Sequence, residues 1–310
     1  MTTNAFGGLS RQAIEWVESK WQGAVLEQAK PLEGGTSSLL YEIRATKDGE
    51  EQSVVLRLHH KGEWLDQEPD LAKHEAMSLE LAAAAGISAP HLLAFDETGA
   101  ACGMPAVLMT KVPGTVILPA ANDQDWLDGL AKTLAEMHQH RAHDFPYEYF
   151  AYNDARRLER PKWSRVEGDW MRAFYIVAAG GPPSDYCLIH RDYHPGNVLW
   201  ENGQVSAVVD WVNACRGPAG VDVGHCRVNL AQLYGTRVAN EFLDAYERYT
   251  GSAFSYDPYW DLLSLIDTLD GAPAVYPGWQ AFGMTGLSDE LVRFRLDEYL
   301  MSLMERFDDF

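Results

Sequence analysis

The chain has 310 residues, of which 46% are hydrophobic and 23% charged, and its formal net charge is −20. This is the composition of a globular protein with a large core. The acidic balance argues against a nucleic-acid partner, because phosphate backbones are bound by clustered Lys and Arg. The longest apolar runs fall far short of the roughly 20 residues that a membrane span needs. We therefore expect no membrane association. The sequence does not indicate an oligomeric state.

The four cysteines are Cys102, Cys187, Cys215 and Cys226, and no two of them have Cys-x-x-Cys spacing. In a chain of this length, that pattern is typical of free thiols in a reducing compartment. The first residues show no basic segment followed by an apolar one, so no signal peptide is indicated. Together these features predict a cytoplasmic protein.

The first 110 residues predict a mixture of helices and strands. Apolar residues at helical spacing follow Ser10, a good helix cap. A second helical segment is expected to be capped by Asp70 and to stop at Gly86. Alternating apolar segments separated by turn residues predict strands. The predicted elements are helices over 10–21 and 70–86, and strands over 24–32, 38–46 and 52–59, with further strands before 96 and before 113.

A turn of small residues, Gly34-Gly35-Thr36-Ser37, separates the first two predicted strands. Small residues let the backbone lie close to a ligand and direct amides and hydroxyls at phosphate oxygens. By itself, however, a Gly-Gly turn between strands is usually only a hairpin turn. Its interpretation as a phosphate-binding loop therefore depends on a motif further along the chain.

From Asp123 onward the pattern changes to helices. Apolar residues recur at helical spacing up to His138, and further helical segments follow residue 220. Residues 145–186 are rich in aromatic and basic residues, and we expect them to form a helical pair that shapes a substrate site. His138, His140 and His143 do not predict a metal site, because the first two point to different faces of a helix.

The most informative stretch is Ile189-His190-Arg191-Asp192-Tyr193-His194-Pro195-Gly196-Asn197-Val198-Leu199-Trp200, followed by Val208-Val209-Asp210-Trp211. Asn197 stands five positions after Asp192, and Asp210 stands thirteen after Asn197. This spacing matches the catalytic loop and second metal ligand of protein kinases. Asp210 precedes Trp-Val rather than Phe-Gly, so the chain is not a eukaryotic-type protein kinase.

The longer string, His-x-Asp-x-His-Pro-Gly-Asn-x-Leu with Val-Asp-Trp, Gly217-Pro218 and Asp222, resembles the aminoglycoside phosphotransferase and choline kinase-like family of small-molecule kinases. The resemblance implies an α+β, bilobal, protein-kinase-like fold. It implies a nucleotide-binding N-lobe over 1–110, with an antiparallel sheet and a helix. Residues 111–310 would form a mainly helical C-lobe with the catalytic loop, metal site and acceptor site. Arg191 stands where many members have Gly, and we expect no effect on the chemistry.

The resemblance also implies a role for each matching residue. Asp192 would orient the acceptor hydroxyl, while Asn197 and Asp210 would hold Mg²⁺. Arg57, in place of the usual Lys, would bind the nucleotide α/β-phosphates with Glu75 as its partner. Glu80 is the alternative partner. The alternative interpretation of Arg57 is a surface charge on an edge strand. Gly34, Gly35, Thr36 and Ser37 would cover the phosphates, and the hinge at about Met109 to Val112, including Lys111, would contact the adenine. Asp222 would accept a hydrogen bond from the catalytic-loop backbone, and His190 and His194 would brace that loop.

The expected activity is transfer of the γ-phosphate of ATP, with GTP as the other candidate donor, to a hydroxyl of a small molecule. The acidic balance favours a cationic acceptor such as an aminoglycoside, although it also serves solubility. The C-terminal residues, ending in Asp308-Asp309-Phe310, resemble tails that contact the acceptor in some aminoglycoside kinases. Two other interpretations stay open: a metal-dependent hydrolase using His190, Asp192 and His194, and a nucleotide-binding protein without catalysis.

Overall fold

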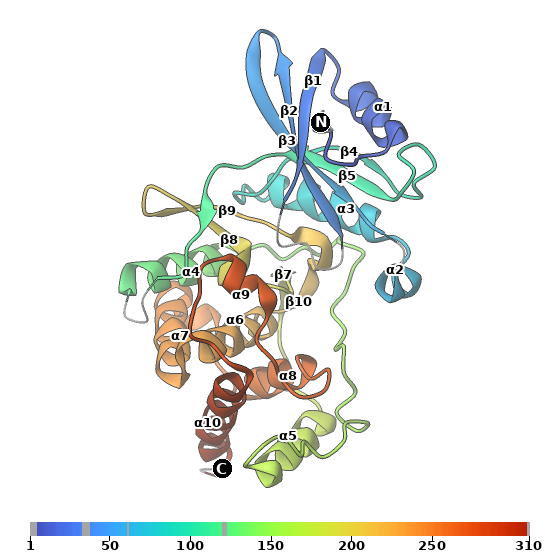
Figure 1. Cartoon of the computed structure of the whole chain (residues 1–310). Helices are drawn as coiled ribbons and strands as arrows, with labels where there is room; N and C mark the ends of the chain where they lie inside the picture. The colour runs from blue at the N-terminus through green and yellow to red at the C-terminus, as the bar shows by residue number, and fades with distance from the viewer. Residues whose placement is uncertain (1–4, 33–37, 61, 120–122, 309–310) are drawn as a thin grey trace. The chain divides into compact units, whose positions relative to one another are not determined.

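The computed structural model describes residues 5–32, 38–60, 62–119 and 123–308 (Figure 1). The chain divides into two compact units, Met1–Pro113 with Ser206–Asn213, and Gly114–Val205 with Ala214–Phe310. A short segment after residue 205 therefore joins the N-terminal unit, and the boundary expected near residue 110 did not include it.

The N-terminal unit is built on a five-stranded antiparallel sheet with the order β1-β2-β3-β5-β4. β3 lies in the middle of this sheet, so both of its edges are paired. The short 3₁₀ helix at Trp211–Asn213 also belongs to this unit and packs against α3. The elements are α1 (Arg11–Lys20), β1 (Ala24–Pro31), β2 (Leu39–Lys47), β3 (Glu50–Leu58), α2 (Glu63–Gln67), α3 (Leu71–Ala84), β4 (Leu92–Asp96) and β5 (Ala106–Thr110).

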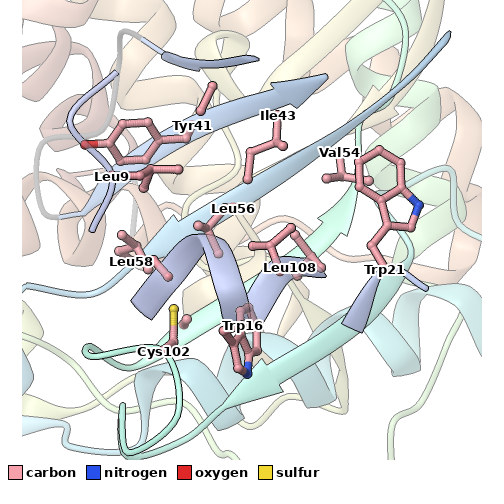
Figure 2. Close-up of a cluster of buried hydrophobic side chains, with 14 of the residues drawn as sticks. Leu9, Trp16, Trp21, Tyr41, Ile43, Val54, Leu56, Leu58, Cys102 and Leu108 are labelled. Atoms are coloured by element: carbon pink, nitrogen blue, oxygen red, sulfur yellow. The ribbon is translucent and has the colours of Figure 1, made fainter. Parts of the chain in front are cut away.

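One face of the sheet carries an apolar cluster that includes the buried side of α1 (Figure 2). Leu56 and Leu58 of β3 lie in it with Ile43 of β2 and with Trp16 and Trp21 from α1 and its end. Because successive side chains of a strand point to opposite faces, Arg57 lies on the other face of the sheet. α3 packs against β4 and β5. The alternation of β3 thus separates the apolar core from the candidate functional residues.

The helix ends can be compared with the capping residues that the sequence predicts. The Oγ of Ser10 accepts a hydrogen bond from Ala13 N at 3.1 Å, so the predicted cap of α1 is confirmed. Gly86 ends α3 in the left-handed region with φ 71°, as the sequence predicts. Asp70 is different: its side chain makes no capping hydrogen bond to α3, because its backbone (φ −102°, ψ 18°) lacks the extended conformation of a helix cap. Asp70 therefore stands at the N-cap position of α3, as expected, but without the side-chain hydrogen bond of a cap.

The C-terminal unit is mainly helical, with two small sheets of order β10-β7 and β6-β8-β9, and β9 continues into the segment assigned to the N-terminal unit. Short 3₁₀ helices lie at Pro195–Asn197 and Gly251–Ala253. The other elements are β6 (Thr115–Val116), α4 (Gln124–Met137), α5 (Glu167–Ala179), β7 (Tyr186–Ile189), β8 (Val198–Glu201), β9 (Gln204–Val208), β10 (Cys215–Pro218), α6 (Ala219–Tyr234), α7 (Thr236–Thr250), α8 (Tyr259–Asp267), α9 (Pro277–Ala281) and α10 (Asp289–Asp308).

A buried polar network ties four of these helices together. Arg227 of α6 is fully buried, pairs with Asp261 of α8 and donates to Asn240 Oδ1 of α7 at 2.7 Å. Tyr299 of α10 donates to the same aspartate at 2.6 Å. A buried cation needs such satisfied partners, since an unpaired one costs several kcal/mol. The network therefore fixes α6, which carries residues of the candidate site.

Residues 145–186 contain α5 as their only α-helix, so the expected helical pair is wrong. Residues 145–166 are mostly irregular and are held by contacts to distant segments. Tyr149 N donates to Arg216 O at 3.0 Å, and Asn153 N donates to Asp267 Oδ1 at 3.1 Å. Pro146 and Pro161 disfavour a continuous helix here. Among the described residues, no helix is both long enough and apolar enough to cross a membrane.

Candidate active site

In the N-terminal unit, the candidate site is centred on Arg57, which is buried and only 5% exposed to solvent. Its Nε lies 3.2 Å from Glu75 Oε1 of α3, and its Nη1 lies 2.8 Å from Asp210 Oδ1. Because β3 is the central strand, the alternative of a surface charge on an edge strand is wrong. A guanidinium with carboxylates on two sides is a fixed cation of the kind that binds phosphate in a forked geometry.

The structure selects Glu75 over Glu80 as the partner of Arg57. Glu75 is 1% exposed, whereas Glu80, five residues on, is exposed to solvent. Burial by itself would raise the pKa of Glu75, but Arg57, with His59 and His74 nearby, outweighs it and holds that pKa below its ordinary value. The carboxylate is therefore charged at neutral pH, and the ion pair is complete.

His59 belongs to this cluster and was missed by the sequence analysis. It directly follows β3, it is 1% exposed, and its Nε2 lies 3.7 Å from Glu75 Oε2. The signal was its position two residues after Arg57, which places both side chains on the same face of a strand.

Asp210 follows β9 and adopts φ 68°, in the left-handed region that non-glycine residues rarely enter. It lies in the Ser206–Asn213 segment and is described with the N-terminal unit, whereas Asp192 and Asn197 belong to the C-terminal unit. A strained backbone at a polar residue is a feature of functional sites.

Two other expected nucleotide contacts have different outcomes. Gly34, Gly35, Thr36 and Ser37 lie outside the described residues, as does the carboxyl end of the chain. Met109, in β5, is buried, and Lys111 follows that strand. The Nζ of Lys111 donates to Glu42 Oε1 at 2.9 Å, which lowers the pKa of Glu42 below its ordinary value. The lysine side chain is thus anchored to β2, and its backbone is the part that remains for a ligand.

In the C-terminal unit, the catalytic-loop backbone is held by one fully buried carboxylate. The two oxygens of Asp222, in the first turn of α6, accept from the N–H groups of His190 and Arg191, each at 2.7 Å. This confirms the predicted hydrogen bonding of the loop backbone to Asp222. Behind it, His138 Nε2 lies 3.1 Å from Asp222 Oδ2, and its Nδ1 lies 2.7 Å from the hydroxyl of Tyr246.

Asp192 is flanked by a hydrogen-bond donor and two imidazoles. Asn197 Nδ2 donates to Asp192 Oδ2 at 3.1 Å and to the backbone oxygen of Asp192 at 2.9 Å. His225 Nε2 lies 3.1 Å and His194 Nε2 3.7 Å from the other oxygen, Oδ1. Burial would raise the pKa of Asp192, but His194, His225 and His190 outweigh it and hold that pKa well below its ordinary value. The group is a carboxylate at neutral pH, as an acceptor of a hydroxyl hydrogen bond must be.

His194 also supports the loop, as expected, because its Nδ1 accepts from Gly196 N at 3.0 Å and so caps the 3₁₀ turn that carries Asn197. His225 was missed by the sequence analysis. It stands three residues after Asp222 on a predicted helix, and this spacing puts both side chains on one face.

The backbone conformation of Arg191 is one that glycine adopts more readily than arginine. Its φ is 67°, a conformation that glycine adopts at little cost and that costs other residues about 1–2 kcal/mol. Contacts offset this strain: its Nη2 donates to Phe150 O at 2.7 Å, and its guanidinium lies 4.0 and 3.9 Å from the ring centres of Phe150 and Tyr152. Arginine is thus retained in a strained conformation by aromatic neighbours.

The residues named for Mg²⁺ have suitable chemistry. Asn197 contacts Asp192 through two hydrogen bonds from its side-chain nitrogen, which turns its side-chain oxygen away from Asp192. Asp210 contacts Arg57 through Oδ1 only, and its side chain is 34% exposed. Carboxylate and amide oxygens are ligands that a hard cation takes. The hydrolase interpretation needs a cluster of metal ligands at His190, Asp192 and His194. Within the described ranges, no three His, Cys, Asp or Glu side chains form a group able to hold a metal ion.

Three solved structures are similar over nearly the whole chain. A Ralstonia eutropha protein with a provisional assignment as an aminoglycoside phosphotransferase has 17% identity and a TM-score of 0.64, covering 96% of this chain and 98% of its own. A mutant of aminoglycoside phosphotransferase APH(4)-Ia, complexed with AMP-PNP and hygromycin B, has 15% identity, TM-score 0.62 and coverages of 94% and 99%. Choline kinase from Cryptosporidium parvum has 12% identity, TM-score 0.56 and coverages of 92% and 90%.

These identities show the fold alone, and they confirm the predicted α+β, protein-kinase-like class. No curated protein matches the sequence. A family model described as "Phosphotransferase enzyme family" matches residues 28–268, a span that contains Arg57, Glu75, Asp192, Asn197 and Asp210. The chain therefore belongs to this phosphotransferase family and is a small-molecule phosphotransferase.

Proposed function

We propose that this protein transfers the γ-phosphate of ATP to a hydroxyl group of a small molecule. The observation that carries the proposal is the Asp192 carboxylate, kept ionised among His194, His225 and Asn197 on a loop whose amides are held by Asp222. In this role Asp192 accepts a hydrogen bond from the acceptor hydroxyl and aligns its oxygen for attack on phosphorus. Phosphoryl transfer needs mainly such positioning and charge stabilisation.

Arg57 would bind the α/β-phosphates, held in place by Glu75. Gly34, Gly35, Thr36 and Ser37 would cover the triphosphate, and the backbone from Met109 to Lys111 would meet the adenine edge. Asn197 and Asp210 would hold Mg²⁺, which neutralises phosphate charge when it is bound. The AMP-PNP bound by APH(4)-Ia supports a nucleotide donor for this chain as well.

For the acceptor we propose a cationic, hydroxyl-bearing compound, with an aminoglycoside as the first candidate. The net charge of −20 supports this class, because an acidic protein attracts cationic ligands. Hygromycin B bound to APH(4)-Ia supports it by analogy of fold. An aminoglycoside acceptor would make the protein an antibiotic-resistance enzyme. The four free, buried cysteines support the proposed cytoplasmic location.

The experiment is a screen of the purified protein with Mg²⁺ and either ATP or GTP, using coupled detection of ADP or GDP release. The acceptor panel contains aminoglycosides, macrolides and amino alcohols. Acceptor-dependent release with ATP, lost in Asp192→Ala, is the expected result. Nucleotide binding without turnover over the whole panel would instead favour a nucleotide-binding protein without catalysis, and turnover of macrolides only would overturn the aminoglycoside assignment.

A further inference from the structure

The carboxylate of Asp192 is contacted on both oxygens, by Asn197 and His194 of its own loop and, at a shorter distance than His194, by His225 of α6. Asn197 Nδ2, from the same loop, donates to Oδ2 at 3.1 Å. His225 Nε2, from the middle of α6, lies 3.1 Å from Oδ1. A carboxylate held on only one oxygen can rotate about its last side-chain torsion, which has a broad energy well. The contact from α6 therefore sets the plane of the carboxylate.

The helix that supplies this contact is itself fixed to the loop. Asp222, three residues before His225, accepts both loop amides at 2.7 Å. Residues three apart on a helix face the same way, so one face of α6 contacts both the loop backbone, through Asp222, and the Asp192 side chain, through His225. The Arg227 network anchors the next turn of the same helix. The position of His225 relative to Asp192 is thus determined by packing on both sides.

We propose that His225 is a positioning residue for phosphoryl transfer: it orients the carboxylate of Asp192 toward the acceptor hydroxyl, and α6 is the element that couples loop backbone and carboxylate. This inference rests on the proposed function of Asp192. His225 is not itself assigned a contact with the substrate.

The charged groups that face His225 come from several elements. They are Asp192 and His194 of the loop, Asp222 of α6 and Asp267 at the end of α8. Burial lowers the pKa of His225, but Asp192, with Asp222 and Asp267, outweighs it and raises that pKa above the ordinary value. The imidazole is therefore protonated through the lower part of the neutral range, and its contact with Asp192 at 3.1 Å is then an ion pair.

Two variants separate a positioning role from a merely structural one. His225→Leu removes the donor and keeps side-chain volume, and we expect kcat to fall roughly 10- to 100-fold, as for a slightly misplaced catalytic group. His225→Gln places an uncharged donor near the Nε2 position, and we expect it to recover most of that loss. The KM for ATP should stay within about twofold in both, because neither variant alters the groups assigned to the nucleotide.

The pH profile gives a readout that a structural role would not move. The wild-type kcat should decline as pH rises through the raised pKa of His225, whereas His225→Gln should show no such decline between about pH 6 and 9, because its donor does not titrate. His143→Gln, at an exposed position of the same unit, is the matched control and should retain the wild-type profile.

An NMR titration of the histidine ring signals separates failure of this inference from failure of the proposed function, since it needs no acceptor. The pKa of His225 should fall in Asp192→Asn, because the main charge that raises it is gone. An unchanged pKa there would overturn the pairing whatever the activity. Equally, a kinase whose His225→Leu variant keeps wild-type kcat and folding would overturn the positioning role and leave the proposed function intact.

Discussion

The central groups of the two parts of the candidate site carry opposite charges. In the N-terminal unit a buried cation, Arg57, stands between the carboxylates of Glu75 and Asp210. In the C-terminal unit a carboxylate, Asp192, stands among His194, His225 and the amide of Asn197. The difference matches the chemistry proposed for each: a fixed cation binds phosphate, and a fixed carboxylate orients a hydroxyl. Each central group is kept charged by neighbours of opposite charge or by donors.

The arrangements also differ in what supports them. Arg57 and Glu75 come from β3 and α3, regular elements whose positions follow from the sheet and its packing. Asp192 lies on a loop, in which the amides of His190 and Arg191 both donate to the carboxylate of Asp222. We therefore expect substitution of Glu75 to act mainly on stability, substitution of Asp192 to act mainly on kcat, and substitution of Asp222 to act on both.

The largest expected effect is on catalysis. Asp192→Ala should lower kcat by roughly 10³-fold, or about 4 kcal/mol of transition-state stabilisation, because it removes the group that orients the hydroxyl. Its stability should fall less than that of Glu75→Gln, since the Asp192 side chain is 33% exposed and that of Glu75 is 1% exposed. Steady-state kinetics and a thermal melt measure the two effects. Asp185→Ala, at an exposed aspartate, is the control, and full activity of Asp192→Ala would refute the assignment.

Next in size is a loss of stability in the N-terminal unit. Glu75→Gln should lower the free energy of unfolding by about 3 kcal/mol, at the lower end for a broken buried pair because Asp210 still contacts Arg57. Chemical denaturation measures this effect. Glu80→Gln, exposed on the same helix, should be nearly neutral, and equal effects of both variants would contradict a buried pair.

The same variant has a pH signature. The pKa of Glu75 is lower in the folded protein than its ordinary value of 4.5. The contribution of Glu75 to stability is therefore fully present above the unfolded-state pKa and is lost as pH falls through the folded-state pKa. Wild-type stability should decline more steeply under acid conditions than that of Glu75→Gln. Parallel curves for the two proteins over this range would show that the shift is absent.

A smaller effect on both properties is expected at Asp222. Asp222→Asn replaces one acceptor oxygen with a donor, so one loop amide loses its partner and the free energy of unfolding should fall by about 2 kcal/mol. The kcat should also fall, by roughly tenfold, as the loop loses its fixed position. Kinetics and denaturation of the same preparation test this coupling. Asp244→Asn, exposed on α7, should alter neither quantity.

The smallest expected effect isolates backbone strain at Arg191. Arg191→Ala and Arg191→Gly both remove the contacts with Phe150 and Tyr152, but only glycine relieves the positive φ. The glycine variant should therefore be more stable than the alanine variant by about 1 kcal/mol. At Glu80, within a helix, the same comparison should favour alanine by about 1 kcal/mol. An alanine preference at Arg191 would exclude strain there.

The sequence by itself determined those features that depend on a few neighbouring residues. The alternation around Arg57 placed it opposite Leu56 and Leu58, Gly86 ended its helix, and the motif spacing identified the loop that Asp222 holds. Such signals are reliable because periodicity and turn chemistry act within one element. The α+β class was implied by the family resemblance that the motif carries, and the similar solved structures confirm it.

The tertiary structure alone decided the choices between residues that are equivalent in the sequence. Glu75 and Glu80 share one helix, and only the packing of α3 buries the first of them. Asp192 and His225 meet across more than 30 positions of the chain, and residues 206–213 join the unit that precedes them by about 100 positions. The irregular path of 145–166 depends on distant partners too. These contacts arise from the packing of whole elements, which no local pattern records.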